Sequence, residues 1–184
     1  MKRKLTVCLF GIAFLLLGAC ANDDETANEL IDYYNNDWQK LQTMKSEKIG
    51  DRAFDWVAFD KEENPEEGIE YLENEVLPEL DALRDYLYSI EPKTEAVREL
   101  HQLQIEAEEF GFQIIEENTM EYYRDEIEDE EIWAKVDELK DKYDAFSERL
   151  HKLMGDYDLE FEKDTNEEGK TIQVIRKKIK LENV

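Results

Sequence analysis

Residues 132–155 read IWAKVDELKDKYDAFSERLHKLMG, and their pattern decides the predicted fold. The apolar residues of this stretch recur at alternating spacings of four and three: Ile132, Val136, Leu139, Tyr143, Phe146, Leu150 and Leu153. That spacing is typical of an α-helix that buries one face. Gly155 follows the last apolar residue, at a position where a left-handed residue commonly ends a helix. The stretch therefore predicts a long amphipathic helix that ends near Gly155.

The first of three upstream stripes predicts a broken helix. Its members are Leu30, Tyr34, Trp38, Leu41 and Met44. Gly50 weakens the pattern, and the aromatic segment 53–59 (AFDWVAF) is followed by a charged run. We therefore expect a break, or a short second helical piece, in this region.

The second and third stripes predict two more long helices. The second comprises Ile69, Leu72, Val76, Leu80, Leu83, Leu87 and Ile90, and the third comprises Val97, Leu100, Leu103, Ala107, Phe110 and Ile114. Asn64 and Pro65 precede the second stripe and are typical of a helix start, with Asn as the N-cap and Pro in the first turn. Pro78 lies inside this helix and predicts a kink, because its nitrogen cannot donate to the preceding turn.

The period changes after Gly155. Tyr157, Leu159 and Phe161 alternate with polar residues, as in a strand, and a polar turn at 164–169 separates them from an apolar segment that fits either a strand or a helix. The predicted fold class is therefore all-α. We expect an antiparallel helical bundle over residues 28–155, with three long helices and a broken first helix, and a small C-terminal hairpin or tail over residues 156–184.

Charge excludes one class of function. Residues 20–184 carry 20 basic and 48 acidic side chains, a net charge of −28. Binding to nucleic acid through phosphate neutralisation needs clustered Lys and Arg, so the composition excludes it, and direct docking on anionic lipid is disfavoured. Residues 170–184 reverse the trend with a net charge of +4. We expect this basic end to lie back on the acidic body rather than to face a membrane.

The first 19 residues are typical of an export signal, with three basic residues followed by an apolar run from Leu5 to Leu17 that is short for a membrane span. Leu17-Gly18-Ala19-Cys20 resembles the lipobox of bacterial lipoproteins. The resemblance implies that Cys20 becomes the lipidated N-terminus, that acyl chains such as palmitate anchor the protein to the outer face of the cell membrane, and that residues 20–27 are a tether. The alternative is an ordinary cleaved signal with an unrelated Cys.

The sequence favours a non-enzymatic protein. The chain after Cys20 has no thiol, and its three serines lie in charged or helical surroundings rather than in a strand–turn–helix elbow. The glycines after residue 20 are scattered singly, so there is no phosphate-binding loop. We expect no cofactor, no disulfide and no catalytic residue.

The two histidines are the most specific candidates for a metal site. Glu148 and His151 have the Glu-x-x-His spacing by which helical bundles hold two metal ions, but His101, the other histidine, follows Arg98 and completes no second pair. We therefore predict no metal site and a solvated or interfacial His151. The turn at 164–169 resembles half of a calcium loop but lacks the final Glu, so we interpret it as a hairpin turn.

Aromatic residues suggest a binding surface. They are dense between residues 33 and 59, and Trp56 and Phe59 lie off the helical stripe. Exposed rings at these two positions could hold a partner protein or stack on sugars. The alternative, which we favour for the cluster as a whole, is that the rings pack in the core, since Tyr34 and Trp38 lie on the helical stripe.

Residues 83–155, which begin LRDYLYSIEPKTEAVRELHQLQIEA and continue through an acidic helical hairpin to a Gly-Asp end, resemble the small helical lipoproteins of Firmicutes, including proteins labelled cell-wall-binding lipoproteins. The most distinctive part is Val97-Arg98-Glu99-Leu100-His101. The resemblance implies export and a helical fold, and it implies no catalytic residue. We expect a lipid-anchored module that binds an envelope protein or cell-wall material. The alternatives are a metal or small-ligand carrier that uses acidic residues with His101 or His151, and a toxin-neutralising surface lipoprotein.

Overall fold

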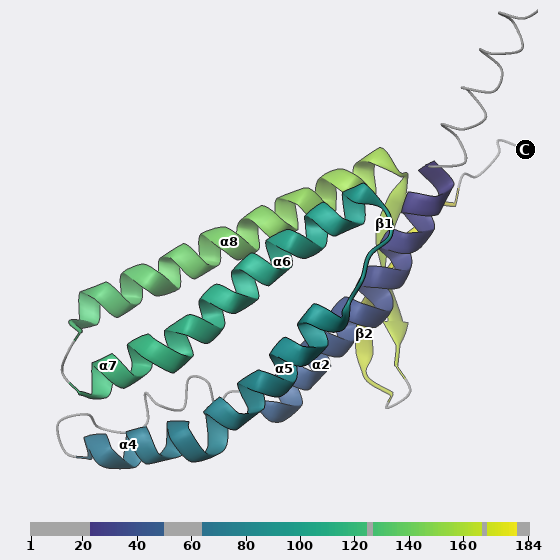
Figure 1. Ribbon diagram of the computed structural model, residues 1–184. Helices are drawn as coiled ribbons and strands as arrows, with labels where there is room; N and C mark the ends of the chain where they lie inside the picture. Colours follow the sequence, from purple (N-terminus) through teal and green to yellow (C-terminus); the bar gives the residue numbers. More distant parts are fainter. Residues whose placement is uncertain (1–22, 50–63, 125–126, 167–168, 180–184) are drawn as a thin grey trace, which may run out of the picture.

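The computed structural model describes residues 23–49, 64–124, 127–166 and 169–179. The described chain is mostly helical, and a small antiparallel hairpin follows the last helix (Figure 1). This confirms the predicted helical class and the C-terminal hairpin. Among the described residues, no helix combines the length and the apolar character needed to cross a membrane.

Four helical segments precede the hairpin, and three of them contain a π-helical turn. Segment 1 is helical over residues 23–32 and continues as η1 (Tyr33–Trp38) and α2 (Gln39–Lys48). Segment 2 consists of α4 (Pro65–Tyr71), η3 (Leu72–Val76) and α5 (Leu77–Ser89). Segment 3 consists of α6 (Glu95–Gln113), η4 (Ile114–Asn118) and α7 (Thr119–Tyr123), and segment 4 is α8 (Asp129–Asp156).

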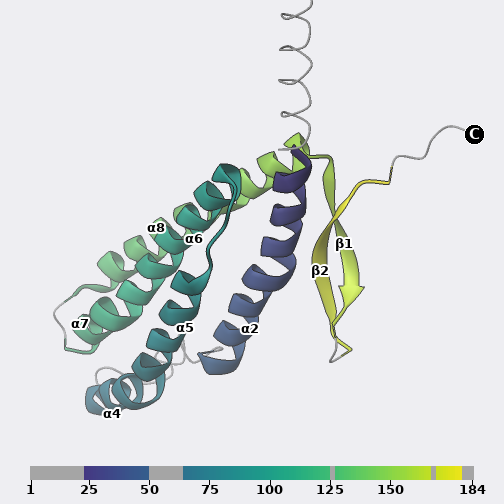
Figure 2. The same ribbon diagram turned by 45° about the vertical axis from the view of Figure 1, so that its right-hand side comes forward.

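Successive segments run in opposite directions (Figures 1 and 2). The closest packing between long helices joins α6 to α8, and α5 contacts both α2 and α6. The connection between α5 and α6 and the start of segment 1 lie at one end of the molecule, whereas α4, α7 and the start of α8 lie at the other (Figure 1).

Segment 1 starts earlier than the sequence pattern indicated. Residues 23–27 lie in the predicted tether, yet they are helical, and Thr26 and Ala27 are buried. The apolar stripe did not indicate this turn, because the first residues of the turn are Asp23, Asp24 and Glu25. Acidic residues are favourable at a helix N-terminus. The segment then continues without a break to Lys48, and the expected break near residues 50–59 lies outside the described residues.

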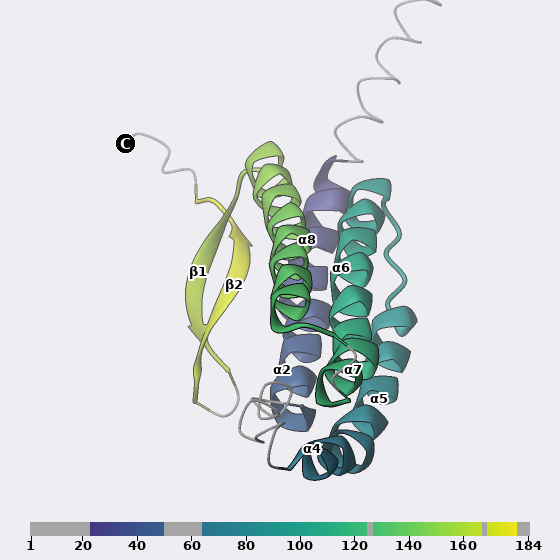
Figure 3. The ribbon, with the colours of Figure 1, turned by 90° about the vertical axis from the view of Figure 1, so that its left-hand side faces the viewer.

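The predicted features of segment 2 are largely present. Asn64 precedes α4 and Pro65 is its first residue, although the Asn64 side chain makes no capping hydrogen bond. The π-helical turn η3 ends just before Pro78, and the segment changes direction between α4 and α5 (Figure 3). A wider turn accommodates the ring of Pro78 and the missing N–H, which accounts for the predicted kink.

The end of α8 differs from the prediction. Gly155 remains helical, the helix extends to Asp156, and the left-handed residue is Asp158, with a φ of 53°. Asp tolerates this conformation better than most residues, so a glycine was not needed at the turn. The left-handed residue therefore comes three positions later than Gly155, and the helix itself ends one residue after that glycine.

The core consists of two apolar clusters. The far-end cluster contains Leu41, Ile49, Leu72, Val76, Leu80, Leu83, Leu87, Phe112, Met120, Tyr123, Ile127 and Ile132. The hairpin-end cluster contains Leu30, Tyr33, Tyr34, Val97, Leu100, Phe146, Leu150, Leu153, Met154, Leu159 and Ile175. The stripes predicted in segments 1, 2 and 4 are the buried or half-buried faces of those segments.

The hairpin is formed by β1 (Leu159–Thr165) and β2 (Thr171–Lys177), paired antiparallel from Leu159 opposite Lys177 to Thr165 opposite Thr171. β2 lies between β1 and the helices in two views of the molecule (Figures 2 and 3). The ring of Phe161 packs on Tyr34, with centroids 5.5 Å apart. Lys177 Nζ lies 2.9 Å from a carboxylate oxygen of Asp24, so this part of the basic end contacts the acidic body.

We predict that Leu83→Ala lowers the free energy of unfolding by about 2–5 kcal/mol, because Leu83 is completely buried in the far-end cluster and truncation leaves a cavity. Urea denaturation followed by circular dichroism would measure the change. Trp133→Ala is the control, since this side chain is 56% exposed and its loss should cost less than about 1 kcal/mol. Equal effects of the two substitutions would contradict the assignment of the core.

Candidate functional site

A layer of polar side chains lies between the two apolar clusters. On α6, His101, Gln104 and Glu108 are all at least 95% buried, and they lie between Leu100 of the hairpin-end cluster and Phe112 of the far-end cluster. Segment 1 contributes Tyr33 and Lys45 to the polar layer, and α8 contributes Tyr143.

Tyr33 joins the two polar residues nearest the hairpin end. Its hydroxyl donates to Gln104 Oε1 and lies 3.2 Å from His101 Nδ1. A phenol has one proton, so with that proton on Gln104 the His101 ring must donate from Nδ1 to the Tyr33 oxygen. Burial raises the pKa of Tyr33, which keeps the hydroxyl protonated.

His101 is held neutral. Burial lowers its pKa, and a smaller contribution from the Leu87 backbone opposes this shift. The buried Nε2 atoms of His101 and Gln104 have no hydrogen-bond partner within 3.5 Å among the described residues. No carboxylate of the described residues is paired with the ring, so a positive charge at His101 would be buried without compensation.

A closed triangle of hydrogen bonds forms the other half of the polar layer. Lys45 Nζ donates to Glu108 Oε2 at 2.8 Å and to the Tyr143 hydroxyl at 3.0 Å, and that hydroxyl donates to Glu108 Oε2 at 3.0 Å. Burial acts to lower the pKa of Lys45, but the Glu108 carboxylate and Tyr143 outweigh it and raise the pKa. Burial, together with Glu108, raises the pKa of Tyr143 to about 12.

The polar layer fixes the register of the helices rather than presenting a reactive group. Its ammonium, carboxylate and hydroxyl groups are directed at one another, and Glu108 is only 1% exposed. The triangle of Lys45, Glu108 and Tyr143 is satisfied within itself, so any slip of its helices would leave charged groups unpaired.

The third apolar stripe, like the other three, consists of buried or half-buried residues, but it named apolar residues alone and so missed the polar layer. The buried face of α6 includes Val97, Leu100 and Ala107 as predicted, but Leu103 and Phe110 are only half-buried. The polar side chains at 101, 104 and 108 occupy the buried face in their place. Their spacing of three and four was a usable signal that a rule based on apolar residues alone does not detect.

A cleft of about 380 Å³ opens between segment 1 and the α5–α6 connection. Its floor is apolar, with Tyr33, Ile90, Pro92 and Val97, and its walls carry Glu25, Asn28, Glu29, Asp32, Asp37, Glu91 and Lys93. Carboxylates outnumber the one lysine five to one in this lining. We call this feature the acidic cleft.

Glu29 holds one side of the acidic cleft in place. Its carboxylate accepts hydrogen bonds from the backbone N–H of Lys93 and, at 2.8 Å, from that of Thr94, immediately before α6. Burial acts to raise the pKa of Glu29, but hydrogen bonds from Thr94 and Lys93 lower it overall. Burial, with Asp32 nearby, raises the pKa of Asp37. The cleft therefore combines a carboxylate fixed by hydrogen bonds with one whose pKa is raised.

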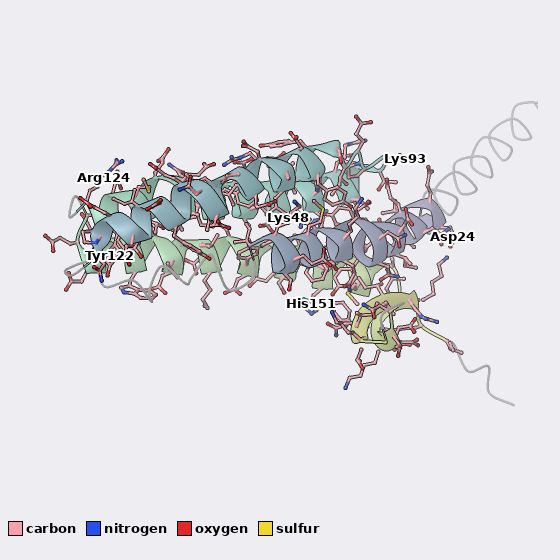
Figure 4. The ribbon with its side chains drawn as sticks, turned by 90° about the horizontal axis from the view of Figure 1, so that it is seen from below. Asp24, Lys48, Lys93, Tyr122, Arg124 and His151 are labelled. Atoms are coloured by element: carbon pink, nitrogen blue, oxygen red, sulfur yellow. The ribbon has the colours of Figure 1, made fainter. Side chains whose placement is uncertain are left out.

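The two histidines that the sequence singled out lie in different surroundings. His101 is buried, which differs from a solvated histidine, whereas His151 is exposed on α8 beside the hairpin, with its ring 5.7 Å from that of Phe161 (Figure 4). Cys20, Trp56 and Phe59 lie outside the described residues. Lipidation at Cys20 and the aromatic binding surface therefore stay predictions.

The described residues contain no group of three or more His, Cys, Asp or Glu side chains placed to hold a metal ion. In the hairpin turn, Asp164 is engaged by the Arg176 guanidinium and by the N–H of Thr165, and Asn166 Oδ1 accepts from the N–H of Lys170. These oxygens stabilise the turn.

Comparison of the chain with protein-family models, curated proteins and solved structures finds no match. Function is therefore inferred from the sequence and the structure of this chain.

We predict that Lys45→Met lowers the free energy of unfolding by about 3 kcal/mol, because it leaves the Glu108 carboxylate buried without its cation. Adding Glu108→Gln to Lys45→Met should recover at least half of that loss, since the remaining group is neutral. A double-mutant cycle in urea measures this coupling. If the losses from the two single substitutions simply add, Lys45 and Glu108 do not interact.

We predict that stability falls as the pH drops below about 6.5, the ordinary pKa of histidine. The folded-state pKa of His101 is lower than the unfolded one, so below that pH the unfolded chain binds more protons, and unfolding becomes easier by at most about 1.4 kcal/mol per pH unit. The measurement compares unfolding at pH 7.5 and 5.5 for the wild type and His101→Gln. The variant should lose this part of the pH dependence, and His151→Gln should keep it.

Proposed function

We propose that the chain is a lipid-anchored, extracytoplasmic lipoprotein that acts as a non-enzymatic binding module at the cell envelope. The acidic cleft carries the proposal, because it is a cavity with a mostly acidic lining at the end of the molecule from which the chain continues back toward Cys20. The partner that fits it is an envelope protein or cell-wall material that presents positively charged groups.

The position of the first helix supports the anchored part of the proposal. Residue 23 is already helical, and only two residues separate it from Cys20. An extended chain spans at most about 3.6 Å per residue, so acyl chains on Cys20 would hold this end of the body within roughly 10 Å of the membrane surface. Asp24 and Lys93 lie at this end, and Tyr122 and Arg124 lie at the opposite end (Figure 4).

The lining of the acidic cleft supports the choice of partner. Glu25, Asp32 and Glu91 are exposed, so a ligand would reach them without disturbing the core. A basic side chain or amine could pair with these carboxylates while its carbon chain rests on the apolar floor. A lining that combines mostly negative charge with apolar residues is suited to binding a cationic group.

We also propose that the four helical segments form an antiparallel bundle that keeps the cleft walls in a fixed relation. The alternating direction of the segments and the contacts of α5 with α2 and α6, and of α6 with α8, support this arrangement. The polar layer would then act as its alignment device, with Tyr33 reaching both the layer and the cleft floor.

The anchor is tested by Cys20→Ala in the full-length chain expressed in cells. We expect the variant to lose incorporation of labelled fatty acid, because the thiol that would carry the acyl chains is removed. Equal labelling of the variant and the wild type, or no labelling of the wild type, would contradict the anchor.

The cleft is tested by crosslinking on intact cells. A variant with Glu25→Gln, Asp32→Asn and Glu91→Gln should recover about tenfold less of any partner that the wild type enriches, because three exposed charge interactions are lost. The matched control is Glu66→Gln, Glu67→Gln and Glu70→Gln, which removes the same charge from exposed positions of α4 at the other end. Equal recovery by the two variants, or no enriched partner, would count against the cleft.

A further inference from the structure

The two edges of the hairpin differ in what pairs with them. Side chains of segment 1 occupy the outer edge of β2: Asn35 Nδ2 donates to the carbonyl of Ile175 at 3.0 Å, and the N–H of Ile175 donates to Asn35 Oδ1 at 2.8 Å. Gln39 Nε2 donates to the carbonyl of Gln173 at 2.5 Å, one helical turn further along. Asn35 thus makes the two hydrogen bonds that a neighbouring strand would make.

The register shows which groups of β1 point outward. Lys178 N–H bonds the carbonyl of Asp158, and Asn166 N–H bonds the carbonyl of Lys170, both at 2.9 Å, so these two pairs are hydrogen-bonded pairs. In an antiparallel ladder, hydrogen-bonded pairs alternate with pairs whose backbone groups point away. With the observed register, the outward-pointing residues of β1 are Leu159, Phe161, Lys163 and Thr165.

Part of this outward edge has no partner in the described part of the chain. The N–H of Thr165 is taken by the carboxylate of Asp164, but no hydrogen bond from another described residue reaches the outward backbone groups of Phe161 and Lys163. β1 faces away from the helices in two views (Figures 2 and 3). An edge strand with open donors and acceptors is a template for a further strand.

Charge selects the kind of strand that fits. β1 carries Glu160, Glu162 and Asp164 against one lysine, Lys163. Arg176 of β2 pairs with Glu162 and Asp164, so it offsets part of this negative charge and leaves the row acidic overall. A second copy of the chain would place the same acidic row against this one and would bring a body of the same strong negative charge, so self-pairing is opposed by repulsion. A basic strand would meet complementary charge.

We propose that the outer edge of β1 binds an extended, basic polypeptide segment of a partner protein by strand addition. The segment forms backbone hydrogen bonds with Phe161 and Lys163, and its basic side chains lie along the acidic residues of β1. This surface is separate from the acidic cleft and does not depend on the function proposed for that cleft.

The test uses a synthetic peptide of alternating lysine and valine, with the detergent-solubilised full-length protein. We expect the peptide to bind and to slow amide hydrogen exchange at Phe161 and Lys163. The same peptide with every backbone nitrogen methylated keeps its charge but cannot donate hydrogen bonds, and it should bind at least about tenfold more weakly. Equal binding of the two peptides, or no binding at all, would overturn the proposal.

Lys163→Pro is the decisive variant, because the N–H of Lys163 points outward and its loss removes no hydrogen bond between β1 and β2. Peptide affinity should fall at least about tenfold, whereas Lys163→Ala should bind at least as well as the wild type. Slow exchange at Glu162 and Val174 would show that the hairpin is intact in each variant. If the proline variant unfolds the hairpin, the exchange at Phe161 in the wild type decides: slowing by the peptide supports the proposal and unchanged exchange overturns it.

Sedimentation of the full-length protein tests the competing occupant. We expect no dimer in the working range of concentration. A dimer that Lys163→Pro dissociates would show that the edge belongs to a second copy, and it would overturn the choice of a basic partner.

Discussion

The arrangement of the helices depends on the buried contact between Lys45 and Glu108, with Tyr143 as the third member. The apolar stripes determine which face of each helix is buried. Packing of leucines alone, however, permits many alignments of one helix along another. A carboxylate that is 1% exposed accepts only the alignment that brings its ammonium and hydroxyl partners to it. Three segments of the chain are therefore held in one register by a single acidic side chain.

Tyr33 extends this constraint toward the surface. Its hydroxyl belongs to the polar layer with His101 and Gln104, and its ring lines the acidic cleft. A shift of segment 1 along its axis would break the contacts of Tyr33 and Lys45 together. The walls of the cleft are consequently positioned by groups that lie deep in the core.

Much of the helical part of the fold could be predicted from the sequence, because burial of one face imposes a spacing that single residues reveal. The stripes from Ile69 to Ile90 and from Ile132 to Leu153 are the buried or half-buried faces of their helices. Short-range sequence rules were wrong at two helix ends. The pattern predicts a left-handed turn at Gly155, but Asp158 adopts it. The acidic residues 23–25 are typical of a tether, but they form the first turn of a helix. The spacing of the polar residues on α6 was a usable signal, but their partners were beyond a single-sequence argument, since nothing at Lys45 indicates that its counter-charge lies 63 residues away at Glu108.

The pairing of Asn35 with the backbone of Ile175 has a mechanical consequence. The hairpin and the N-terminal helix are joined by bonds that lie across the helix axis, from Asp24 with Lys177 to Gln39 with Gln173. A pull on the chain at residue 23 along that axis loads these bonds in shear, so several must break together rather than one after another. The molecule should therefore resist tension at its N-terminal end better than its small hairpin would suggest, which is what the proposed anchor at Cys20 would require of it.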